Sequence, residues 1–211
     1  MLKVIFFDLD DTLYPRRDGL MKQIGERIQR FAETRFNLTA AQAQAQRKHW
    51  RETHGTALRG MTEEGRDFDV EDFFSFVHDV PLDHVQPDPR VREMLLGLNL
   101  RRAILTNADD KHAARILKHL GIEDCFEKII DVKALELVNK PHREAYERAL
   151  GMMGVSAHEA VFVEDTPVNT RTARAMGMLT ILVDCPPSAD ADWFISDVWQ
   201  VGDVIKTFVQ V

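Results

Sequence analysis

The sequence has 211 residues, of which 45% are hydrophobic and 29% charged, and its formal net charge is -7 at pH 7. This length suits one medium-sized core, alone or with a small insertion. The negative balance argues against a protein that coats nucleic acid polymers, since its acidic side chains would repel phosphates.

The apolar segments and the cysteines bear on location. No apolar stretch approaches the roughly 20 residues of a membrane span, and the first residues do not resemble a secretion signal. The two cysteines, Cys125 and Cys185, show neither Cys-x-x-Cys spacing nor a disulfide framework. We therefore expect a cytoplasmic protein that does not enter a membrane.

The first predicted element is a strand over residues 4–7, which are all apolar. Such a run is typical of a strand buried on both faces, as in a parallel sheet covered by helices. Asp8, Asp10 and Asp11 follow it and cannot belong to a core. Ligands bind at the carboxyl ends of the strands in open α/β sheets. Asp8 and Asp10 are therefore candidates for binding a divalent cation and a phosphate.

The next segment, residues 14–87, contains no good strand pattern. Amphipathic patterns predict helices over 20–36, 39–54 and 70–78. An insertion after the first strand would lie over the carboxyl ends of the sheet, where a lid is useful. We expect residues 14–87 to form a helical cap, and residues 1–13 and 88–211 to form the core.

Strand and helix patterns alternate through the rest of the chain. Further strands are predicted over 103–106, 128–131, 160–163 and 179–183, with an edge strand over 192–195. Helices are predicted between them over 88–98, 111–120, 143–152 and 168–176. This alternation predicts an α/β fold with a doubly wound, parallel, Rossmann-like sheet.

Polar side chains follow the other predicted strands. They are Thr106 and Asn107 after the second strand, Lys140 after the third, and Glu164 and Asp165 after the fourth. In one doubly wound sheet they share an edge with the acids of the first strand. A carboxylate nucleophile, a second acid, oxygen ligands for Mg²⁺ and an ammonium group suit phosphoryl transfer.

These segments resemble, in order, the four motifs of the haloacid dehalogenase superfamily of hydrolases. The matching segments are Asp8-Leu9-Asp10-Asp11-Thr12, Leu105-Thr106-Asn107, Lys140-Pro141 and Glu164-Asp165. The resemblance covers about residues 1–13 and 88–200. It implies the same fold, with an inserted α-helical cap.

The resemblance also implies catalytic roles. Asp8 is the implied nucleophile and Asp10 the implied general acid and base. Thr106, Asn107 and Lys140 are the implied phosphate-binding residues, and Lys140 also balances charge. An acid at position 10 implies phosphate chemistry, because dehalogenases of this superfamily lack it.

A Mg²⁺ site is implied as well. Its ligands would be Asp8, the backbone carbonyl of Asp10, and Asp165, with Glu164 close by and Asn169 supporting the ligands. Without the resemblance, each segment keeps a plainer interpretation as a turn, a helix cap or a loop acid pair, and Asn169 as a solvated helix residue.

The inserted segment resembles that of pyrimidine 5'-nucleotidases of the superfamily. We expect His54, Arg59 and Met61 to read the substrate, although a connecting loop between helices is the plainer interpretation. Phe73, Phe74 and Phe76 are expected in the cap core rather than as a base-stacking platform.

The expected function is therefore a phosphomonoester hydrolase that forms an aspartyl-phosphate, with a nucleoside 5'-monophosphate as substrate. The alternatives are a sugar-phosphate or phosphoglycolate phosphatase and, less favoured, a phosphosugar mutase. A non-enzymatic binding module is disfavoured because none of the four motifs is missing. The oligomeric state stays open.

Overall fold

The computed structural model describes residues 1–209, and six parallel strands form its sheet. The strands are β1 (Val4–Phe7), β2 (Arg101–Leu105), β3 (Lys128–Ile130), β4 (Ala160–Glu164), β5 (Leu179–Val183) and β6 (Trp193–Ile195). Their order is β3-β2-β1-β4-β5-β6. The chain winds outward from β1 in one direction and then in the other, so the predicted doubly wound sheet is confirmed. The switch point between β1 and β4 is where such sheets bind ligands.

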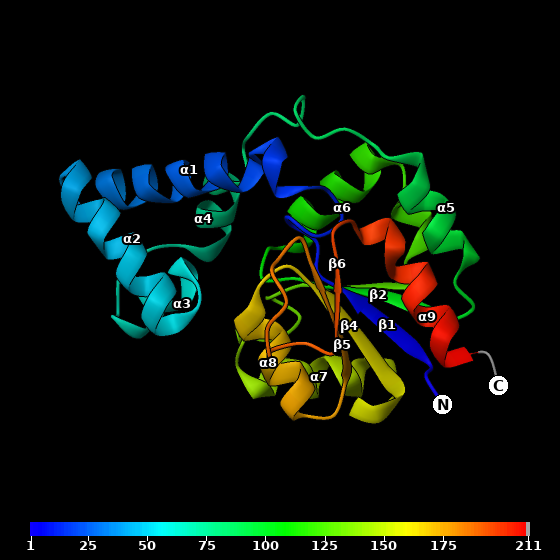
Figure 1. The fold of residues 1–211 in the computed structure, drawn as a ribbon. Helices are drawn as coiled ribbons and strands as arrows, with labels where there is room; N and C mark the ends of the chain where they lie inside the picture. The colour runs from blue at the N-terminus through cyan, green and yellow to red at the C-terminus, as the bar shows by residue number, and fades with distance from the viewer. Residues whose placement is uncertain (210–211) are drawn as a thin grey trace.

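Helices cover both faces of this sheet (Figure 1). One face packs on α5 (Pro89–Gly97), α6 (Asp110–Leu120) and α9 (Val201–Val209), and the other on α7 (Arg143–Met153) and α8 (Pro167–Ala175). Strand β1 shows why its sequence is continuously apolar. Ile5 and Phe7 join the first core, whereas Val4 and Phe6 join the second, because successive side chains point to opposite faces.

Four helices separate β1 from α5. They are α1 (Leu20–Arg35), α2 (Ala40–His54), α3 (Ala57–Glu63) and α4 (Val70–Val77). Figure 1 shows them as a group beside the sheet. Thr39 begins α2 with a capping box, in which its side chain and that of Gln42 each bind the other's backbone N–H. Helix α3 was not predicted as a helix.

This group of helices has a hydrophobic core of its own. Phe31, Trp50, Met61, Phe73 and Phe74 are buried together in it. Phe73 and Phe74 of α4 are buried in this core, which confirms their predicted packing. Phe76 packs against the same core and is partly buried. Helix α3 approaches α2 closely because Gly60 has no Cβ, which would collide with the Trp50 ring.

Two further observations concern the whole described chain. Within residues 1–209, no helix is both long and apolar enough to cross a membrane. The cysteines are free thiols: Cys125 is buried and Cys185 is partly exposed.

Candidate active site

The switch point brings two acids side by side. The N–H of Asp8 donates to the carbonyl of Val163 at 2.8 Å, so the pairing of β1 with β4 continues one residue beyond β1. Glu164 is the last residue of β4. The side chains of Asp8 and Glu164 therefore meet at the carboxyl edge of the sheet, as the sequence predicted.

Lys140 lies between these two carboxylates. Its Nζ is 2.7 Å from Asp8 Oδ1 and 2.8 Å from Glu164 Oε2, and its side chain is only 2% exposed. Burial lowers the pKa of Lys140, but the two carboxylates outweigh it and the net shift is upward. The lysine is thus held as a buried cation.

One lysine does not neutralise two buried acids. Burial, with the nearby Glu164, raises the pKa of Asp8 to about 7 in spite of Lys140. Burial likewise raises the pKa of Glu164 to about 7. Asp8 and Glu164 can therefore both ionise at neutral pH only if further positive charge, beyond that of Lys140, lies nearby.

Glu164 is occupied by contacts that hold it in place. Its Oε1 accepts the backbone N–H groups of Asp165 and Thr166 at 3.0 and 3.1 Å. Its Oε2 accepts the Asn169 side chain at 2.9 Å, besides Lys140. Asn169 is therefore buried beside the acids and is not a solvated helix residue.

The second predicted strand end contributes Thr106 and Asn107. The Asn107 amide donates to the Lys140 carbonyl at 3.0 Å and accepts the Lys140 N–H at 2.8 Å. Both of its polar atoms thus hold the lysine-bearing backbone. Thr106 Oγ1 accepts the N–H of Ala108 at 3.0 Å, so its hydroxyl hydrogen is available for another acceptor.

Three carboxylates form a possible cation site. Oxygens of Asp8, Glu164 and Asp165 lie within 4.8 Å of one another. Hard divalent cations such as Mg²⁺ prefer oxygen ligands, and this donor set, short of positive charge, fits one. Thr12 donates to Asp8 Oδ2 at a long 3.3 Å, so this oxygen is the less firmly bound of the two.

An unpredicted arginine also reaches these acids. The Arg16 guanidinium forms a short ion pair with Asp165 and lies 3.4 Å from Asp11. Arg16 belongs to a short turn that leads toward α1, and its side chain is 52% exposed. In the sequence, only the position of Arg16 shortly after the first motif could have indicated that it lies near these acids.

Asp10 is held by two residues to which the sequence assigned no role. The Tyr14 hydroxyl lies 2.6 Å and His112 Nε2 lies 2.9 Å from the same oxygen, Asp10 Oδ1. Burial raises the pKa of Asp10, but His112 and Tyr14 lower it and the net shift is downward. The free protein therefore holds Asp10 as a carboxylate.

The inserted helices touch the core beside Lys140. The His54 carbonyl accepts the Asn139 side chain at 3.2 Å. At Gly55, where φ is +82°, a Cβ would lie 2.8 Å from Asn139 Nδ2 and 3.1 Å from Pro141 Cδ. The loop after α2 thus lies directly against the loop that carries the lysine.

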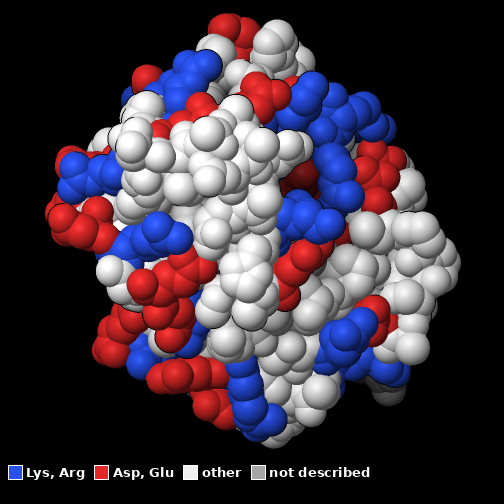
Figure 2. All heavy atoms as spheres, turned by 90° about the vertical axis from the view of Figure 1, so that its left-hand side faces the viewer, with Lys and Arg blue, Asp and Glu red and all other residues white. Residues whose placement is uncertain are grey.

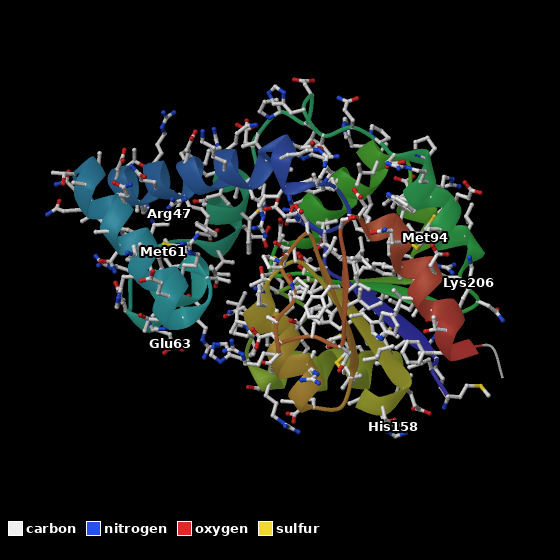
Figure 3. All side chains as sticks on the ribbon, viewed as in Figure 1. Arg47, Met61, Glu63, Met94, His158 and Lys206 are labelled. Atoms are coloured by element: carbon white, nitrogen blue, oxygen red, sulfur yellow. The ribbon has the colours of Figure 1, made fainter. Side chains whose placement is uncertain are left out.

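The other two substrate-reading candidates lie in different surroundings. Arg59 pairs with Glu63 at 3.0 Å and its side chain is 27% exposed. Met61 is completely buried in the core of the inserted helices, and Figure 3 shows it between them. This burial gives Met61 a packing role and no surface for a substrate.

Further ion pairs join α4 to the core. Glu71 binds Lys111 and Lys133, each at 2.9 Å, and His78 binds Asp109 at 2.8 Å. Figure 2 shows the molecule from the side of the inserted helices, with Lys and Arg side chains gathered beside a recessed acidic group. Charged groups therefore contribute to the contact between the two parts, beside apolar contacts such as that of Leu20 with the core.

Comparisons with known proteins agree with this arrangement. Residues 2–177 match the family model described as haloacid dehalogenase-like hydrolase. Phosphate metabolism protein 8 of Saccharomyces cerevisiae is 28% identical over 191 residues, which is 83% of this chain. The chain spans 60% of the length of that relative.

Two other matches extend over nearly the whole chain. A glyceraldehyde 3-phosphate phosphatase of Methanocaldococcus jannaschii is 23% identical over 224 residues, covering 98% of each protein. A crystal structure titled as a HAD phosphatase from Thermococcus onnurineus matches with a TM-score of 0.67 and 16% identity, covering 97% of this chain and 98% of that one. The structural match shows the shared fold. On the family model, the chain belongs to the haloacid dehalogenase-like hydrolases.

Proposed function

We propose that this hydrolase is a Mg²⁺-dependent phosphomonoester phosphatase that works through an aspartyl-phosphate on Asp8. The observation that carries the proposal is the buried group of Asp8, Lys140 and Glu164 at the switch point, with Lys140 Nζ 2.7 and 2.8 Å from the two acids. A buried lysine beside a carboxylate suits attack on a negatively charged phosphate, because it offsets their mutual repulsion.

The proposed reaction has two steps. Asp10, a carboxylate in the free protein, first takes up a proton from solvent as the substrate binds. An Asp8 oxygen then bonds to phosphorus while the ester P–O bond breaks, and the departing oxygen takes this proton from Asp10. A water then attacks the phosphorus of the aspartyl-phosphate, and Asp10 takes up the proton that this water loses. Inorganic phosphate leaves, Asp8 is again a carboxylate, and Asp10 either returns its proton to solvent or keeps it for the next substrate.

The metal and phosphate contacts follow from the same edge of the sheet. Asp8, Asp165 and the backbone carbonyl of Asp10 would hold Mg²⁺, with Glu164 adjacent. When bound, the cation supplies positive charge that stabilises the phosphoryl group in the transition state. Arg16, which pairs with Asp165, would then compete with the cation for this carboxylate.

Phosphate binding is proposed for Thr106, Asn107 and Lys140. The Thr106 hydroxyl has its hydrogen available, and backbone N–H groups near the start of α6 can add further donors. Asn107 also holds the Lys140 backbone through both polar atoms of its amide, and the second hydrogen of its NH₂ group can be donated to phosphate.

For the organic group, we propose that residues 14–87 act as the cap and that the loop around His54, with Arg59, faces the substrate. A nucleoside 5'-monophosphate is supported by the resemblance of this segment to pyrimidine 5'-nucleotidases. The similarity to a glyceraldehyde 3-phosphate phosphatase over 98% of the chain favours a small sugar phosphate as the second candidate. The cytoplasmic location remains a prediction.

A phosphate-release screen tests the proposal. The unmodified protein with Mg²⁺ is assayed on UMP, CMP, AMP, glyceraldehyde 3-phosphate and phosphoglycolate, and Asp8→Asn is the control. We expect release that depends on Mg²⁺ and is abolished in the variant. A preference for sugar phosphates would replace the nucleotide assignment. Release that survives in Asp8→Asn, or an isomerised sugar phosphate without release, would overturn the phosphatase mechanism.

A further inference from the structure

One oxygen of the Asp10 carboxyl group accepts two hydrogen bonds. Tyr14 lies 2.6 Å and His112 Nε2 2.9 Å from Oδ1. Burial and the nearby Asp10 raise the pKa of Tyr14 well above its ordinary value, so the phenol remains a donor. Among the described side chains, those of residues 1–208, none forms a hydrogen bond with Oδ2. The two carboxyl oxygens are thus in different environments.

The surroundings of His112 determine which of its nitrogens carries the hydrogen. The side chain is completely buried, and Nδ1 has no hydrogen-bond partner among the described residues. An N–H at Nδ1 would be a buried donor without an acceptor, which is costly. The hydrogen therefore belongs on Nε2, and His112 donates it to Asp10 Oδ1.

The His112 ring is held in place from the side of the inserted helices. The ring of His78 stacks on it, with centroids 4.0 Å apart and an angle of 23° between the planes. Phe74 of α4 also stacks on His78, with ring centroids 5.4 Å apart. His78 is also fixed by its 2.8 Å contact with Asp109. The position of His112 therefore depends on where α4 lies.

We infer that His112 and Tyr14 are positioning residues for Asp10: they hold Oδ1 as an acceptor, so that Oδ2 is the oxygen that exchanges a proton with the departing group. This inference rests on the proposed role of Asp10. It assigns the reacting oxygen within the carboxyl group. It also makes proton donation depend on the packing of α4 through the stacked His78 ring.

The test compares two leaving groups. A p-nitrophenolate ion leaves without a proton, whereas an alkoxide needs one. We expect His112→Leu to lower kcat/KM for an alkyl phosphate by about 100-fold, the usual scale of general acid catalysis. The kcat/KM for p-nitrophenyl phosphate should fall by less than about threefold. This parameter reports the first irreversible step, in which the p-nitrophenolate ion leaves without a proton.

Two matched variants complete the test. His112→Gln keeps a side-chain N–H donor and should recover most of the lost activity on the alkyl phosphate. Tyr14→Phe removes one hydroxyl and should give a smaller loss with the same dependence on leaving group. Circular dichroism of each variant checks folding, and if His112→Leu does not fold, Tyr14→Phe and His112→Gln decide the outcome.

Equal losses on both phosphate esters would overturn the inference, because a structural role would lower both. So would failure of His112→Gln to recover activity while folded. These outcomes differ from failure of the proposed function, in which the unmodified protein releases no phosphate from either ester.

Discussion

The carboxyl edge of the sheet and the inserted helices hold their charged side chains in opposite ways. At the sheet edge, Lys140 is 2% exposed and bound to two buried acids. In the inserted helices, Arg59 is 27% exposed and pairs with one half-exposed neighbour, Glu63. Buried ion pairs are costly to disrupt, whereas exposed pairs contribute little. This difference fits the proposal that the sheet edge carries out the chemistry and that the inserted helices recognise the substrate.

The first prediction removes the buried cation. Lys140→Met leaves Asp8 and Glu164 without their partner, which should lower the free energy of unfolding by about 3–5 kcal/mol and abolish phosphate release. Urea unfolding and a phosphate assay measure the two effects. Lys111→Met is the control, since it removes an exposed ion pair with Glu71 and should cost less than about 1 kcal/mol. Similar losses in both variants would contradict the contrast between buried and exposed pairs.

The second prediction concerns pH and metal. The pKa of Asp8 is raised from 3.8 and that of Glu164 from 4.5, each to about 7. A raised carboxyl pKa stabilises the folded state at low pH, and this contribution is lost as the pH rises through about 7. At high pH, where Asp8 and Glu164 are both ionised, a bound cation should stabilise the folded state in place of the lost protons.

Mg²⁺ should therefore raise the melting temperature more near pH 8 than near pH 6, where protons compete for the same oxygens. Differential scanning fluorimetry with and without Mg²⁺ at each pH measures this difference. Burial lowers the pKa of His78, so this residue contributes to stability with the opposite pH dependence. Its contribution cancels, because each increase in melting temperature compares samples with and without Mg²⁺ at the same pH. An increment that is the same at both values would contradict the prediction.

The third prediction concerns the inserted helices. Arg59→Ala should raise KM for the preferred substrate by about tenfold, the scale of one lost charge-assisted hydrogen bond, with kcat nearly unchanged. Glu63→Ala is the matched control, because it removes the ion pair and keeps the arginine. An unchanged KM on every phosphate ester tested would remove Arg59 from substrate recognition.

The smallest expected effect is at Arg16, which joins the two regions. Arg16→Ala frees Asp165 from an ion pair and should tighten Mg²⁺ binding about 1.4- to fivefold, because exposed pairs contribute roughly 0.2–1 kcal/mol. Isothermal titration with Mg²⁺ alone measures it, and Arg17→Ala is the neighbouring control. Weaker binding in Arg16→Ala would show that this arginine does not compete with the metal.

Much of the fold could be predicted from local patterns. The apolar run of β1 reflects burial on both faces, and the expected strands agree with the observed bounds to within two residues. Helix α3 was missed because it is only seven residues long and contains a glycine, Gly60, which is rare within helices. Gly60 is needed there because the Trp50 ring leaves no room for a Cβ. Helix α9 was also missed, although Val201, Val204 and Ile205 have helical spacing.

The site was predictable only in part, for a physical reason. Acids at strand ends are visible in sequence, because parallel strands bring their carboxyl ends to one edge. His112 binds Asp10 from a distance of 102 positions along the chain. Asn107 was predicted to bind phosphate, but its two hydrogen bonds with the Lys140 backbone were not foreseen. Such partners depend on tertiary packing, which no local pattern records.

The most direct test of the aspartyl-phosphate is to trap it. The enzyme is mixed with Mg²⁺ and its best substrate, quenched in acid during turnover, digested and analysed by mass spectrometry. The account predicts that the peptide containing Asp8 gains the mass of one phosphoryl group, and that Asp8→Asn gains none while remaining folded. A phosphoryl group on any other residue, or rapid turnover in Asp8→Asn, would contradict the central claim.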